Sequence, residues 1–183
     1  ALGTSEMPVR DAIRRLVTER GLEVLPNRKV AVPAISLGQF EEILRVRQLL
    51  EGEATEIAAR MMSPSELAEL DRIQTALRGR KSPTKQDIAA ANQQFHYVIY
   101  GASRMPLLLS MIETLWLQSG PTLHHLPIAI SQVEIIAQHD LVLDALRAHD
   151  AAAARAAMIA DLRAGGERIL AEFEIDLVFH LAA

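Results

Sequence analysis

Hydrophobic residues recur at helical spacing over most of the chain. The first such run predicts a helix over residues 8–20, ended by Gly21, with one buried stripe formed by Val9, Ala12, Ile13, Leu16 and Val17. Two short apolar runs follow at 22–25 and 30–32, separated by the turn-forming sequence Pro26-Asn27-Arg28-Lys29. We therefore expect the first 33 residues to form a helix and then a β-hairpin.

From residue 36 onward the pattern is helical. Capping-box sequences begin two helices, one at Ser36 that runs to about Met62 and one at Ser63. Further helices are expected at about 84–100, from Pro106 to Gly120-Pro121, at about 129–148, and from Asp150 into the 170s. Short connections between about six helices predict an antiparallel bundle. The expected fold is mainly α, with a helix and hairpin followed by this bundle.

Composition narrows the class of protein. No apolar run approaches the ~20 residues that a membrane-spanning helix needs, and no signal-peptide pattern opens the chain. The sequence contains no cysteine, which excludes disulfides and thiolate metal sites. These features are typical of a cytoplasmic protein with no membrane partner.

Charge is distributed unevenly along the chain. Residues 1–33 carry a net charge of +2, whereas the whole chain carries −4 and the remainder therefore −6. A small basic segment before an acidic body indicates two functions, and we place the domain boundary between residues 33 and 34. The first segment, 1–33, has too few apolar residues to fold alone, so we expect a further segment before Ala1; the second domain is 34–183.

One group of candidate residues lies in the basic segment. Arg10 and Arg14 are four residues apart on the outer face of the predicted helix, with Arg15 beside them. A helix fits the major groove of DNA, where arginine pairs with guanine or holds phosphates, and Arg28 and Lys29 on the hairpin would suit a wing. Exposed arginines are more often simply solvated, so both interpretations stay open.

A second group is spread over three predicted helices. Asn92 and His96 share one helix face, and His139 and Asp161 each have apolar or small helical neighbours. A buried carboxylate requires a partner. Two imidazoles, a carboxylate and an amide suit Zn²⁺, Mn²⁺ or Ni²⁺ inside a bundle, provided that the three helices converge. The alternative is a set of separate, satisfied polar residues in a core.

Arg47 lies on the first long helix and has two interpretations. Its side chain either points inward to neutralise an anionic ligand or forms a structural pair with Glu51. Two functions would use the same polar cluster without DNA: a metal-dependent helical enzyme acting on a small organic acid, and a ligand-free dimerisation module. The absence of a His-Glu-x-x-His pattern disfavours the enzyme.

Taken together, these segments resemble the GntR superfamily of bacterial transcription regulators, in the FadR branch with its helical FCD effector domain. Residues 2–16 resemble the turn and recognition helix, and 21–28 resemble the wing. The effector-domain likeness lies in Val46–Glu51, in Asn92 with Phe95-His96, in His139 with Leu143–Leu146, and in Ala154–Met158.

The resemblance implies a ligand-sensing DNA-binding regulator and not an enzyme. It implies a winged helix-turn-helix that begins before Ala1, and a homodimer on a palindromic double-stranded operator. By resemblance, Ser5, Arg10 and Arg14 contact DNA and Arg28 contacts it from the wing. A small carboxylate effector would be held by Arg47 and by a metal on Asn92, His96, His139 and Asp161.

Three departures from the family pattern change these expectations. Glu6 stands where arginine is common, and glutamate prefers a cytosine amino group to guanine. Lys29 replaces the usual wing glycine, which affects close approach to the minor groove. In the effector domain, Asn92 replaces an aspartate and Asp161 replaces the last histidine, so we expect metal affinity to be reduced or absent.

Overall fold

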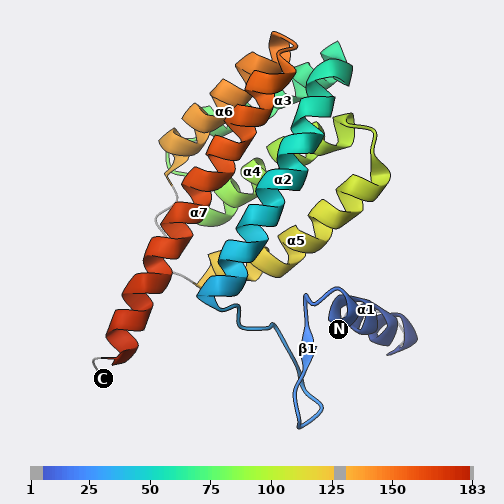
Figure 1. Ribbon diagram of the computed structural model, residues 1–183, viewed down its shortest axis with the longest axis vertical. Coiled ribbons are helices and arrows are strands. Elements are labelled where there is room, and N and C mark those ends of the chain that lie inside the picture. The colour runs from blue at the N-terminus through green and yellow to red at the C-terminus, as the bar shows by residue number, and fades with distance from the viewer. Residues whose placement is uncertain (1–5, 126–130, 182–183) are drawn as a thin grey trace.

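The computed structural model describes residues 6–125 and 131–181, and the side chains of 7–120 and 131–171. The order of elements is α1 (Glu6–Thr18), β1 (Glu23–Val24), β2 (Val30–Ala31), α2 (Leu37–Met61), α3 (Pro64–Arg78), α4 (Lys85–Ala102), α5 (Pro106–His125), α6 (Gln132–Arg147) and α7 (Ala151–Leu181). Helices α2 to α7 form a bundle, while α1 and the hairpin lie beside one end of it (Figure 1). The predicted fold class is confirmed.

Local sequence explains where the bundle helices begin. The Ser36 hydroxyl accepts a hydrogen bond from the backbone N–H of Gln39, and the Gln39 side chain accepts one from the backbone N–H of Ser36. The same reciprocal box is formed by Ser63 with Glu66 and by Thr84 with Asp87. Each box satisfies backbone N–H groups that the first turn of a helix leaves without partners. The caps therefore fix the starts of α2, α3 and α4.

Helices α2 and α7 lie side by side along most of their length (Figure 1). Small residues permit this close packing: Ala54 and Ala58 of α2 and Ala154 of α7 are fully buried. A side chain at Gly52 would meet Ile159 at 3.1 Å. The last turns of α7 continue past the end of the bundle. No helix in the described part of the chain is long and apolar enough to cross a membrane.

Two predicted boundaries are wrong. Helix α5 does not stop at Gly120-Pro121 but continues to His125, although a proline inside a helix removes one backbone hydrogen bond and crowds the preceding turn. Helix α6 begins at Gln132 rather than near residue 129, because Ser131 caps it by accepting from the backbone of Glu134.

The segment before the bundle contacts it through the end of α1. The predicted buried stripe is only partly covered, since Val9 and Ala12 are exposed while Leu16 and Val17 are half-buried. The early residues of the stripe are exposed because the contact lies beyond the other end of the helix. Gln118 of α5 donates to the carbonyl of Glu19 at 3.1 Å, after the last turn of α1.

Gly21 has a different role from the one its position in the sequence predicts. Helix α1 ends at Thr18, and the left-handed residue after it is Arg20, with φ 59°. A Cβ at Gly21 would lie 2.6 Å from Cγ of Leu117 on α5. Glycine is therefore required here for close approach to the bundle. The hairpin follows, with Glu23 paired to Ala31 and its turn closed by Arg28 at φ 63°.

Candidate functional site

Three bundle helices bring His96, His139 and Asp161 together. His96 comes from α4, His139 from α6 and Asp161 from α7, and their ligand atoms all lie within 4.8 Å of one another. Asn92 stands one turn before His96, with Oδ1 3.1 Å from Nε2 of His139. Both imidazoles are 1% exposed. The convergence on which the metal hypothesis depends is therefore present.

The ring of His139 is held rigidly. It stacks on Phe95 with centroids 3.9 Å apart and planes inclined by 4°, and its Nδ1 lies 3.1 Å from Oε1 of Gln74. Burial, and then the neighbouring His96, lowers the pKa of His139 to about 3. Its imidazole is therefore neutral near pH 7, which is the form that binds metal ions.

His96 and Asp161 approach each other without a hydrogen bond. Nε2 of His96 lies 3.1 Å from Oδ2 of Asp161, yet it is a buried polar atom with no hydrogen-bond partner among the described residues. Burial acts to raise the pKa of the Asp161 carboxyl, but His96, His139 and Arg47 together hold this pKa below its usual value. An ionised carboxylate thus faces a nitrogen that lacks a partner.

The donor atoms of this cluster fit a divalent cation. Zinc bonds to histidine nitrogen and carboxylate oxygen at about 2.0–2.2 Å, so ligands on one ion lie within roughly 4.4 Å of each other. The cluster is within a few tenths of an ångström of that requirement. A cation would also satisfy the buried Nε2 of His96, which costs free energy while it lacks a partner.

A second buried network lies next to this cluster. Glu51 is fully buried. Its carboxylate accepts hydrogen bonds from Nε of Arg47 at 2.6 Å, from Nε1 of Trp116 at 3.2 Å, and from the hydroxyl of Tyr100. The guanidinium of Arg47 also lies over the Trp116 ring, 4.6 Å from its centroid. Arg47 thus forms the structural pair with Glu51 that the sequence left open, and its Nη1 makes no hydrogen bond to the described residues.

The sequence prediction missed Gln74, Tyr100 and Trp116. A signal was available for Gln74, because it interrupts the apolar stripe of α3 between Ile73 and Leu77 and is itself buried. Tyr100 lies one turn after His96, on the same helix face. Nothing in the local pattern links Trp116 to Glu51, since 65 residues separate them.

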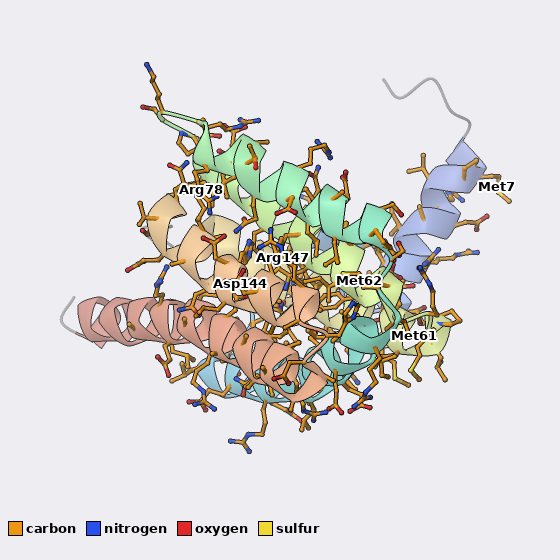
Figure 2. The ribbon with its side chains drawn as sticks, turned by 90° about the horizontal axis from the view of Figure 1, so that it is seen from above. Met7, Met61, Met62, Arg78, Asp144 and Arg147 are labelled. Carbon is orange, nitrogen blue, oxygen red and sulfur yellow. The ribbon has the colours of Figure 1, made fainter. Side chains whose placement is uncertain are left out.

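The predicted DNA-facing residues lie on the outside of the molecule. Arg10 is exposed, and the side chains of Arg14 and Arg15 are 81% and 78% exposed. Arg28 and Lys29 on the hairpin are exposed as well. Met7, near the start of α1, lies at the outer edge of the molecule away from the bundle (Figure 2). Ser5 lies outside the described residues, as does the side chain of Glu6.

Comparison with known proteins identifies clear relatives. The family model for the FCD domain matches residues 42–164. The HTH-type transcriptional regulator McbR of Escherichia coli K12 is 39% identical over 153 residues, which cover 81% of this chain and 69% of that protein. The solved structure of E. coli McbR/YncC has a TM-score of 0.87 at 34% identity, covering 94% of this chain and 83% of its own.

More distant structures share the fold. A GntR-family transcriptional regulator from Pseudomonas syringae pv. tomato has a TM-score of 0.64 at 21% identity, covering 97% of this chain and 75% of its own. The metal-free FCD domain of TM0439 has a TM-score of 0.61 at 18% identity, covering 80% and 99%. At this level of identity the likeness concerns the fold alone.

Proposed function

The chain belongs to the GntR family of transcriptional regulators, in the branch that carries an FCD domain, and from this membership we propose that it is a ligand-responsive, DNA-binding regulator. Membership confirms that the chain is not an enzyme. In this proposal residues 1–33 belong to a winged helix-turn-helix, and residues 34–183 form the effector-binding and dimerisation domain. The protein acts in the cytoplasm as a homodimer on a palindromic double-stranded operator.

The exposed arginines of α1 support DNA recognition. Arg10 and Arg14 are exposed on α1, and the segment after its last turn contacts the bundle through Glu19 and Gly21. In the major groove, each arginine that pairs with guanine contributes about 1–3 kcal/mol of discrimination. Arg15, Arg28 and Lys29 provide further contacts to phosphates, with Ser5 and Glu6 at the start of the helix.

A DNA-binding assay tests this part of the proposal. Duplexes enriched from a random pool by the full-length homodimer would serve as probes in fluorescence anisotropy at several salt concentrations. Arg10→Ala with Arg14→Ala should weaken binding by at least about tenfold while helicity is kept, and each lost phosphate contact should lower the salt slope by about one. Arg72→Ala is the control, because Arg72 pairs with Glu69 on α3, within the bundle. Unchanged affinity in the double variant would refute DNA recognition by α1.

The orphaned Nε2 of His96 is the single observation that carries the sensing function. In the proposal, His96, His139 and Asp161, with Asn92, hold Zn²⁺, Ni²⁺ or Mn²⁺, and the bound ion supplies positive charge for a small carboxylate. Without the ion, the charge around the cluster would repel a carboxylate, since the positive charge of Arg47 is balanced by Glu51 and Asp161 adds a negative charge. Nη1 of Arg47 then adds a donor for the same carboxylate.

Metal titration tests the sensing function directly. Chelator-treated protein should take up about one equivalent of Zn²⁺, Ni²⁺ or Mn²⁺ per chain in calorimetry, and His139→Ala should lose this uptake. His149→Ala is a matched control, because Nδ1 of His149 pairs with the carbonyl of Ala59 away from the cluster. A panel of carboxylates should raise Tm only when metal is present. No uptake by the unmutated protein would exclude the metal.

A further inference from the structure

Each buried histidine of the cluster uses Nδ1 for a hydrogen bond to a neighbouring side chain. Nδ1 of His139 lies 3.1 Å from Oε1 of Gln74 on α3. Nδ1 of His96 lies 2.7 Å from the hydroxyl oxygen of Tyr100, one turn along α4. Which nitrogen carries the hydrogen in each ring depends on what these two partners can do.

Gln74 can only accept a hydrogen bond from His139. Its amide nitrogen donates to Oδ1 of Asp140 at 3.1 Å and to the carbonyl of Ile136 at 3.3 Å, and neither oxygen can donate. Arg78 in turn holds Asp140 with contacts of 2.7 and 2.9 Å. Reversing the amide would place its oxygen against two acceptors. Nδ1 of His139 therefore carries the hydrogen, and the lone pair is on Nε2. The Asn92 amide, 3.1 Å from Nε2, then turns its nitrogen rather than its oxygen to this lone pair, since the two orientations of an amide occupy the same positions.

Tyr100 imposes the same state on His96. Its hydroxyl has one hydrogen, which it donates to Oε2 of the buried Glu51. Glu51 is paired with Arg47 and its carboxylate can only accept, so this contact uses the hydrogen of the hydroxyl. The hydroxyl oxygen must accept from His96, which places the His96 hydrogen on Nδ1 and its lone pair on Nε2.

We propose that Gln74 and Tyr100 are positioning residues that fix both histidines as the Nδ1–H tautomer, which leaves a lone pair on each Nε2, that of His96 beside Asp161 and that of His139 beside Asn92. The inference rests on the proposed metal site, whose occupant would be a divalent cation. It explains why His96 Nε2 has no hydrogen-bond partner 3.1 Å from a carboxylate oxygen. Partners of this kind fix ring orientation and raise ligand basicity, and their loss typically lowers metal affinity 10–100-fold.

Long-range ¹H–¹⁵N correlation spectra of the metal-free, full-length protein test the assignment. In the unmutated protein, Nε2 of both histidines should show the chemical shift of an unprotonated ring nitrogen. Gln74→Leu should move the Nε2 signal of His139 toward the protonated value and lower Zn²⁺ affinity by about 10–100-fold. Tyr100→Phe should do the same for His96.

Gln132→Leu is the control for Gln74→Leu. Gln132 also joins α3 and α6, but its amide donates to the carbonyls of Leu77 and Arg80 and touches neither histidine. This variant should keep both tautomers and the Zn²⁺ affinity.

The spectra separate failure of this inference from failure of the metal site. A protonated Nε2 in the unmutated metal-free protein overturns the inference even if Zn²⁺ binds. An unchanged His139 tautomer in Gln74→Leu overturns the role of Gln74. Unprotonated Nε2 atoms in a protein that takes up no Zn²⁺, Ni²⁺ or Mn²⁺ support the tautomer assignment and refute the metal site.

Discussion

The indole Nε1 of Trp116 on α5 donates a hydrogen bond of 3.2 Å to Oε1 of Glu51 on α2. The same ring lies 5.6 Å from the imidazole of His96, centroid to centroid, and under the guanidinium of Arg47. Helix α5 is thereby joined to the candidate site through one aromatic side chain. Because the chain contains a single tryptophan, its emission comes from this position alone.

Trp116 fluorescence should therefore report on the site. Adding Zn²⁺ to chelator-treated protein should change the intensity or wavelength of emission, because a divalent charge enters close to the His96 ring. His139→Ala should abolish the change, while His149→Ala should retain it. A titration in which both variants respond alike would show that Trp116 senses something other than the cluster.

Glu51 should be among the most sensitive charged residues of the bundle. Glu51→Leu leaves Arg47 partly buried without its partner and removes the acceptor of Tyr100 and Trp116, so we expect a loss of about 3–5 kcal/mol in the free energy of unfolding. Glu53→Leu, two residues away, breaks only a solvent-exposed pair with Arg155 and should change stability by less than about 1 kcal/mol. Urea unfolding followed by circular dichroism provides both values, and equal losses would contradict a central role for Glu51.

Sequence predicted the helices best where local chemistry decides them. Ser36 and Ser63 fix helix starts through contacts within four residues, and the structure confirms both. One error arose where a tertiary contact decides, because Gly21 is needed where Leu117 approaches it. The other is the continuation of α5 through Gly120-Pro121, although both residues usually stop a helix.

The candidate site was predictable only in the residues that could bind a metal ion. His96, His139 and Asp161 each carry a local signal, namely a polar group on an apolar helix face, and the bundle fold brings their helices together. The hydrogen-bond partners of Nδ1 in the two histidines are Gln74 on α3 and Tyr100 on α4, and Tyr100 in turn donates to Glu51 on α2. Periodicity does not specify which side chains of different helices meet. The role of Arg47 also depends on which side chains meet, because its guanidinium either pairs with Glu51, as the structure shows, or is available to a ligand.

Acid should weaken the cap of α3. The backbone N–H of Ser63 donates to the Glu66 carboxylate at 2.8 Å, and this hydrogen bond lowers the pKa of Glu66. Burial acts to raise this pKa, while Ser63 Oγ and Arg104 lower it further. A folded pKa below the unfolded one stabilises the fold above about pH 4.3, and this contribution is lost as pH falls through the folded pKa. Glu66→Gln keeps the capping geometry without the charge. Its stability deficit in urea unfolding should be present at neutral pH and vanish in acid, and a pH-independent deficit would contradict the assignment.

Three consecutive residues of α5 join the candidate site to the end of α1. Trp116 contacts Glu51, Leu117 packs on Gly21, and Gln118 donates to the carbonyl of Glu19. In Gly21→Ala the added Cβ would lie 2.6 Å from Cγ of Leu117, and because Cγ is the branch point of the side chain, the whole side chain has to move. Overpacking of this kind costs about 1–3 kcal/mol.

We expect Gly21→Ala to separate α1 from the bundle without unfolding the bundle. Hydrogen exchange should accelerate in residues 16–22, and Zn²⁺ should alter exchange there in the unmutated protein but not in the variant. Gly38→Ala is the control, because a Cβ there meets no atom within 4 Å. Leu117→Ala in the same chain should restore the contact, since it removes the clashing atoms. If α1 responds to Zn²⁺ equally with and without the Gly21 contact, α5 does not connect the site to α1.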